Sequence, residues 1–198
     1  MKQFLKIVAL SALLFGGLAS ASADTLVSLT PNLSFPVPGA GAGGPFTTAT
    51  FTDTYFAGVY TDPTNPFCAN CLDFVYLEAN SKDSSGSVQT ISVSNFGSYS
   101  TIVGDVTNGV VATDFTSVNG TITYNFSGAN AIGPNQSAGF LVIETNATAF
   151  QAGTVTISDG TDTFTGPGFQ PIPEPATFTL LGTGLLGAVG VIRRKFAV

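Results

Sequence analysis

The segment Thr121-Ile122-Thr123-Tyr124-Asn125-Phe126 alternates polar and apolar side chains without interruption. Because successive side chains of a β-strand point to opposite faces of a sheet, this period of two predicts a strand with one buried and one solvated face. Three further segments show the same alternation. They are Thr50-Phe51-Thr52-Asp53-Thr54-Tyr55-Phe56, Leu72-Asp73-Phe74-Val75-Tyr76-Leu77 and Gly153-Thr154-Val155-Thr156-Ile157-Ser158.

Shorter apolar runs extend this pattern over the chain. They predict strands at 26–29, 88–93, 101–103, 138–144 and 162–165. The turn sequences Asn119-Gly120, Gly133-Pro134-Asn135 and Asp159-Gly160 separate them. Short strands rich in Thr, Val and Phe, at intervals of about 8–12 residues, favour an antiparallel β-sandwich. We therefore expect an all-β domain, either jelly-roll or immunoglobulin-like.

The composition limits the size and the chemistry of this domain. The chain has 198 residues and a formal net charge of −6, with 44% hydrophobic and 9% charged residues. This length allows one ordinary domain with short appendages. The sequence has no histidine, which removes the commonest general base and metal ligand, and only six Lys and Arg residues. Nucleic acid is therefore not an expected partner.

The first 23 residues have the three zones of a secretory signal peptide. Lys2 and Lys6 give a basic start, 7–19 is almost wholly apolar, and Ala21 and Ala23 form a small-x-small cleavage site. The apolar zone is shorter than the ~20 residues that a permanent membrane helix needs. We expect a signal helix over 1–23, cleaved by signal peptidase before Asp24.

The last residues form a second targeting segment. Pro173-Glu174-Pro175 precedes the apolar stretch 176–192, and Arg193, Arg194 and Lys195 follow it. As a helix this stretch would be roughly 25 Å long, slightly less than the ~30 Å hydrocarbon core, and snorkelling basic side chains can accommodate the difference. We therefore expect a transmembrane helix over 176–192, with the basic cluster 193–195 in the cytoplasm and the domain outside.

These three parts together resemble the PEP-CTERM sorting tail of exported bacterial proteins, over 173–198. The resemblance implies that an exosortase recognises Pro173, Glu174 and Pro175 and processes the tail near them. It also implies a Gram-negative envelope or extracellular destination, frequently with exopolysaccharide or biofilm matrix as surroundings. The inner membrane would hold the chain through the C-terminal helix before processing. A simple single-span anchor without processing stays open as the alternative.

Between the two ends lies the exported domain, which we place at 24–165, with a Gly/Pro linker at 166–172. Its Gly-rich run 38–45 is expected to be a loop. From 24 to 172 the chain has eleven acidic residues and one base, Lys82, which gives a net charge of 1 − 11 = −10. Such a domain repels anionic surfaces and attracts cations.

Cys68-Ala69-Asn70-Cys71 is a lone C-x-x-C motif. A redox-active pair requires its first cysteine at a helix N-terminus, but prolines precede this motif and a predicted strand follows it. In an oxidising envelope we expect a structural disulfide between Cys68 and Cys71, worth roughly 2 kcal/mol by the chain-entropy model. Two cysteines without histidine do not complete a zinc site, and no cofactor is expected.

Acidic, hydroxyl and aromatic side chains are candidates for ligand binding. The turn 159–162 offers Asp159 and Asp162 to calcium, with Asp53, Asp62 or Asp114 as further ligands, but two acids in a glycine turn are more often a hairpin, so no metal site is assigned. The Thr-x-Thr pairs suggest an ice- or glycan-binding face, but their spacing along the chain is irregular. They lie at 48–54, 121–123, 154–156 and 161–165.

Five tyrosines are candidates for stacking on sugars, although the chain has no tryptophan. They are Tyr55, Tyr60, Tyr76, Tyr99 and Tyr124. We expect most aromatic side chains to pack between the sheets instead.

The sequence contains few of the motifs that are typical of enzyme active sites. A nucleophile needs a partner base, and the chain has no histidine, no G-x-S-x-G elbow and no P-loop. Lys82, beside Ser81 and Ser84, lies in a polar loop where it stays protonated. A glycosidase with a carboxylate pair, using Glu78 or Glu144, stays open because the sequence does not give distances in space. We predict no catalytic residues and a non-enzymatic structural or interaction module. The alternative is a carbohydrate- or calcium-binding β-sandwich module.

Overall fold

A computed structural model describes residues 23–24, 27–28, 35–106 and 108–172, which form two six-stranded sheets. The expected signal peptide, except for Ala23, and the sorting tail 173–198 lie outside the described residues. Among the described residues, no helix has the length and apolarity to cross a membrane.

Strands account for most of the described chain, with one short 3-10 turn at Gly128–Asn130. The strands are β1 (Ala23–Asp24), β2 (Val27–Ser28), β3 (Phe35–Thr47), β4 (Thr52–Asp62), β5 (Cys71–Asn80), β6 (Thr90–Val93), β7 (Thr101–Val106), β8 (Asp114–Val118), β9 (Thr121–Asn125), β10 (Phe140–Thr145), β11 (Phe150–Ser158) and β12 (Thr163–Pro171).

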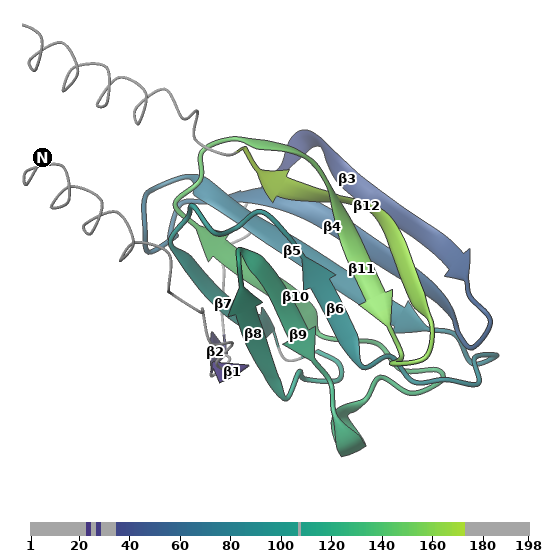
Figure 1. The fold of residues 1–198 in the computed structure, drawn as a ribbon. Coiled ribbons are helices and arrows are strands. Elements are labelled where there is room, and N and C mark those ends of the chain that lie inside the picture. Colours follow the sequence, from purple (N-terminus) through teal and green to yellow (C-terminus); the bar gives the residue numbers. More distant parts are fainter. Residues whose placement is uncertain (1–22, 25–26, 29–34, 107, 173–198) are drawn as a thin grey trace, which may run out of the picture.

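The two sheets lie face to face (Figure 1). Sheet A has the strand order β1-β8-β9-β6-β11-β12, and sheet B has the order β2-β7-β10-β5-β4-β3. All strand pairs are antiparallel except β2 with β7. The chain crosses between the sheets from β1 to β2, β5 to β6, β6 to β7, β7 to β8, β9 to β10 and β10 to β11. Such crossings characterise Greek-key sandwiches and jelly rolls.

The core fills the space between the sheets and follows the alternation that predicted the strands. In β9, Ile122 and Tyr124 are fully buried, while their neighbours along the strand are partly exposed. Buried hydroxyls of tyrosine join the two layers, because Tyr124 donates to the carbonyl of Val142 at 2.9 Å and Tyr76 donates to the carbonyl of Phe169 at 2.9 Å. Polar tips in this core are thus satisfied by the backbone of the opposite sheet.

Two segments expected to be irregular are strands. The run 38–45 belongs to β3, and the predicted linker 166–172 is largely the second half of β12. Both are edge strands, where proline is tolerated because one side of the backbone needs no ladder hydrogen bond. Figure 1 shows β3 and β12 at the same side of the two sheets. The prediction of a linker at 166–172 is therefore wrong, because Gly and Pro do not interrupt a strand at the edge of a sheet.

One glycine in β3 shows how closely the edge strands approach their neighbours. Gly43 has φ of 140°, and a Cβ atom there would lie 2.2 Å from the carbonyl oxygen of Tyr55. Only glycine fits this position. The predicted turn Asn119-Gly120 is also present, with φ of 51° and 76°, as a two-residue hairpin between β8 and β9 requires.

Candidate functional site

The outer face of sheet A, which points away from the core, carries a surface rich in hydroxyls. Strand register aligns threonine and serine side chains into a row that crosses the sheet. The row consists of Thr116 (β8), Thr123 (β9), Ser92 (β6), Thr156 (β11) and Thr165 (β12). We call this set the hydroxyl row.

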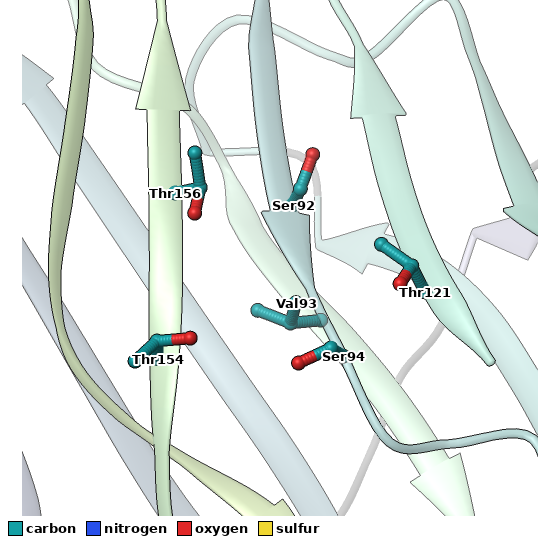
Figure 2. A pocket seen from close by; sticks show the side chains of 6 residues that line it. All are labelled: Ser92, Val93, Ser94, Thr121, Thr154 and Thr156. Atoms are coloured by element: carbon teal, nitrogen blue, oxygen red, sulfur yellow. The ribbon is translucent and has the colours of Figure 1, made fainter. Parts of the chain in front are cut away.

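A shallow depression adjoins the hydroxyl row. Figure 2 shows the hydroxyls of Ser94, Thr121 and Thr154 beside those of Ser92 and Thr156. The depression has a volume of about 220 Å³, and Val93, whose side chain is 2% exposed, completes its lining. No charged residue lines it, so a ligand here would meet hydroxyls together with the apolar carbons of these side chains.

Lateral hydrogen bonds order part of the hydroxyl row. Ser92 and Thr123 share a hydrogen bond of 2.9 Å between their Oγ atoms, and Thr156 and Thr165 share one of 3.2 Å. Each hydroxyl can both donate and accept, so these pairs can also bond to a sugar hydroxyl or to water. The Thr-x-Thr spacing is irregular along the chain, but the cross-strand register makes the array regular in space.

In the turn 159–162, which was considered for calcium, the carboxylates accept hydrogen bonds from the protein itself. Asp159 Oδ1 accepts hydrogen bonds from the amides of Thr161 at 2.8 Å and Asp162 at 2.7 Å, and Asp162 Oδ2 accepts one from Thr50 at 3.0 Å. Burial opposes ionisation of Asp159, but these donors lower the pKa of its carboxyl. Asp53, Asp62 and Asp114 do not join this turn. The geometry is that of a capped hairpin.

Asp53 and Glu78 instead form a carboxyl pair on the core face of sheet B. They lie on neighbouring positions of β4 and β5, and each is 1% exposed. No hydrogen bond of normal geometry from the described residues reaches any of their four oxygens. Burial, reinforced by Asp53, raises the pKa of Glu78 to about 10, and burial also raises the pKa of Asp53. Both shifts favour the protonated form of the carboxyl group.

A second group of acids lies at the other end of the same two strands. Asp62 ends β4, Asp73 lies near the start of β5, and Glu144 lies near the end of β10. Their carboxylate oxygens lie within 4.8 Å of one another. We call these three residues the acidic triad. The sequence makes Asp62 and Glu144 candidates for separate roles and gives no signal for Asp73, because an acid inside an alternating strand does not reveal its partners.

The predicted disulfide between Cys68 and Cys71 is present, with Cα atoms 5.3 Å apart. It closes the loop that connects β4 to β5, and Cys71 lies opposite Asp62 in the strand register. Asn70 inside the bridge has φ of 64°. The disulfide therefore fixes the entry to β5 beside the acidic triad.

The residues considered for catalysis are separated. Lys82 is exposed and forms an ion pair with Asp83 at 2.6 Å, while the hydroxyl of Ser84 donates to the carbonyl of Thr52 at 2.9 Å. Glu78 lies five residues from Asp73, which is the cross-strand partner of Glu144. At about 3.4 Å per residue, Glu78 and Glu144 are therefore much further apart than the carboxyl pair of a glycosidase.

Three of the five candidate sugar-stacking tyrosines are buried. Tyr55, Tyr76 and Tyr124 are at most 5% exposed and belong to the core, as expected for most aromatic side chains. Tyr60 and Tyr99 are partly exposed. Tyr99 donates a hydrogen bond to the carbonyl of Ile172.

Comparison with known families identifies one segment of the chain. Residues 171–195 match the PEP-CTERM protein-sorting motif. No curated protein and no solved structure matches the chain. A tail of this type implies a protein that is exported, held at the membrane, processed by an exosortase and displayed at the surface.

Proposed function

Starting from the sorting motif at 171–195, we propose that the two-sheet domain is a non-enzymatic structural or interaction module of the bacterial envelope or extracellular matrix. Signal peptidase and exosortase are its proposed processing partners. The inner membrane holds the chain through 176–192 before the tail is processed. The hydroxyl row on the outer face of sheet A supports an interaction role.

A neutral polysaccharide is the partner that this face fits best. The hydroxyl row carries no charge, and hydroxyls that both donate and accept match the hydroxyls of a sugar chain. The net charge of −10 over 24–172 repels acidic polymers, since like charges raise the free energy of contact. Carbohydrate binding through sheet A is therefore our candidate for the interaction.

The positions of the acidic and nucleophilic side chains support a non-enzymatic role. Glu78 is 1% exposed and faces Asp53, so it has no access to a polymeric substrate. Glu144 belongs to the acidic triad, and Lys82 is bound to Asp83 at the surface. These arrangements favour a binding or structural module over a hydrolytic enzyme.

Processing can be tested first, by intact mass and fractionation of the native protein. We expect a mature species that lacks 1–23 and the tail beyond Pro173-Glu174-Pro175 and that is recovered outside the membrane. A retained tail in the membrane fraction would instead establish an anchored domain and would overturn the matrix role.

Carbohydrate binding can be tested by co-sedimentation with insoluble neutral and acidic polysaccharides. We expect binding to a neutral polymer, and Thr156→Glu should weaken it because a carboxylate then occupies the middle of the hydroxyl row. Thr54→Glu is the matched control, since Thr54 is exposed on the outer face of sheet B. Equal loss in both variants, or no binding to neutral polymers, would contradict carbohydrate binding.

A further inference from the structure

We propose that the acidic triad, Asp62, Asp73 and Glu144, is a calcium-binding site at one end of sheet B. This site lies in the opposite sheet from the hydroxyl row and does not depend on carbohydrate binding. It also differs from the turn 159–162, in which the acidic side chains are capped by their own backbone.

Strand register places the three acids on one face. Asp73 pairs with Tyr60 of β4 on one side and with Glu144 of β10 on the other. Asp62 follows Tyr60 by two residues, so its side chain points to the same face of sheet B. Three adjacent strands thus each contribute one carboxylate, and the oxygens of these carboxylates lie within 4.8 Å of one another.

These carboxylates are removed from water. Asp73 is 0% exposed, Asp62 is 1% exposed and Glu144 is 6% exposed. Oδ2 of Asp62 and Oδ2 of Asp73 receive no hydrogen bond from the described residues. A buried carboxylate oxygen without a donor is costly, and the cost is relieved when a cation binds it.

The second oxygen of each aspartate is held in place. Asp62 Oδ1 accepts hydrogen bonds from the amide and the hydroxyl of Thr64, both at 2.6 Å. Asp73 Oδ1 accepts one from the side-chain amide of Asn65 at 2.8 Å. One oxygen of each carboxylate is thus oriented by a donor and the other is free, which is how neighbouring groups orient metal ligands.

Among the residues that the structure describes, no basic side chain pairs with this charge. Lys82 is the only basic residue from 24 to 172, and it pairs with Asp83 at the surface. The three carboxylates, whose oxygens lie within 4.8 Å of one another, therefore repel each other when ionised. A bound divalent cation would remove this repulsion.

The ligand chemistry favours calcium. Three carboxylates without histidine or cysteine are hard oxygen donors, which suit calcium and magnesium rather than zinc. Calcium accepts six to eight oxygens in flexible geometry, so bidentate carboxylates and water can complete a site of three acids. Magnesium requires a near-octahedral site and retains most of its water, which a buried triad does not favour.

Thermal unfolding of the full chain in detergent, first in EDTA and then in calcium or magnesium, tests this site. When free calcium exceeds the Kd about 100-fold, we expect Tm to rise by about 5–10 °C. An equal rise with magnesium would overturn the assignment to calcium. No rise with either ion at millimolar concentration would overturn the site.

Asp73→Asn gives a signature that a merely structural role does not. In EDTA we expect its Tm to equal or exceed that of the wild type, because one buried charge is removed, whereas in calcium it should fall below the wild type. Asp83→Asn is the matched control and should keep the full calcium response, since Asp83 is exposed. A calcium response in Asp73→Asn equal to that of the wild type would contradict the site.

A measurement that does not depend on Tm uses terbium as the probe. Tyr60 is the cross-strand neighbour of Asp73 and can transfer excitation to terbium bound at the triad. We expect terbium luminescence that decreases when calcium displaces the ion, and Glu144→Gln should lower the affinity for terbium at least tenfold. This second variant keeps the site testable if Asp73→Asn does not fold. Luminescence unaffected by Glu144→Gln would place the ion elsewhere.

Discussion

Buried carboxyl groups lie at both ends of the β4–β5 pair, and the two groups differ in the hydrogen bonds that they accept. At one end Asp53 and Glu78 face the core, and none of their oxygens receives a hydrogen bond of normal geometry from the described residues. At the other end Asp62 and Asp73 face away from the core, and each has one oxygen held by Thr64 or Asn65. Both groups are equally buried, so burial does not distinguish them.

The hydrogen-bond donors around each group account for the difference. Donors stabilise the ionised form of a carboxyl, whereas burial without donors favours the protonated form. The core pair is therefore neutralised by a proton, and the acidic triad is arranged for a cation. The same residue type acquires two roles within one hairpin, according to which face of the sheet it occupies.

Glu78→Gln is expected to have the largest effect. Burial raises the pKa of Glu78 to about 10 in the folded state, against 4.5 for an ordinary glutamate, so the folded state retains a proton that the unfolded state loses. This contribution to stability is complete below pH 4.5 and is lost as the pH rises to about 10, by about 1.4 kcal/mol per unit. Glutamine resembles the protonated acid and does not titrate, so at pH 9 the variant should be the more stable protein, by a margin that grows with pH.

Urea unfolding between pH 8 and 10 measures this effect, in a range where Asp73, with a pKa of about 7, is already mostly ionised. The wild type should lose stability with rising pH, and Glu78→Gln should be nearly flat. Asp83→Asn is the control for a surface charge and should keep the wild-type slope. A parallel slope in Glu78→Gln would show that the pair is ionised in the folded state.

Removal of the disulfide tests the other end. Cys68→Ser/Cys71→Ser should lower the free energy of unfolding by about 2 kcal/mol, since it releases the loop that leads into β5. The calcium response should weaken as well, because Asp62 lies opposite Cys71 in the register. The slope of stability above pH 8 should not change. Unaltered Tm after reduction would contradict a structural role of the disulfide.

Asn65→Ala should act more weakly and more selectively. It removes the donor to Asp73 Oδ1 and a hydrogen bond to the carbonyl of Thr145 at 3.2 Å. We expect a loss of about 1 kcal/mol in stability and roughly tenfold weaker calcium binding, measured by calorimetry. Unchanged calcium affinity would show that Asn65 does not orient the triad.

The smallest effect is expected for Thr123→Ala in the hydroxyl row. It removes one partner of the 2.9 Å hydrogen bond with Ser92 on the solvated face. Stability should change by less than about 0.5 kcal/mol, with no change in the calcium response or in the pH slope. A larger loss in urea unfolding would indicate that the row contributes to the fold itself.

The sequence predicted the strands whose one face is buried and missed the segments that depend on neighbours. Alternation identified 121–126, where buried and partly exposed side chains alternate; the segment 72–77 was also predicted, although its residues 72–76 are buried on both faces. The strand β8, Asp114–Val118, has only one fully buried side chain, Phe115, so no clear period was visible. The edge strand β3 was hidden by glycine and proline, which are permitted there only because of its position in the sheet.

The same limit applies to the candidate sites. The disulfide was predictable because its two cysteines are three residues apart. The acidic triad joins residues of three strands, and Asp73 and Glu144 meet only through the register of β5 with β10. The regularity of the hydroxyl row likewise exists across strands and not along them.

The place where β12 ends also determines how freely the displayed domain could turn. The strand ends at Pro171, and the amide of Ile172 still donates to the carbonyl of Ala149 at 3.2 Å. Pro173-Glu174-Pro175 follows directly in the sequence, so the slack between the folded domain and the processing motif is at most a few ångströms, at roughly 3.5 Å per residue. A group joined to the chain at this point would therefore be attached at the edge of sheet A, through a linker too short for the domain to rotate freely.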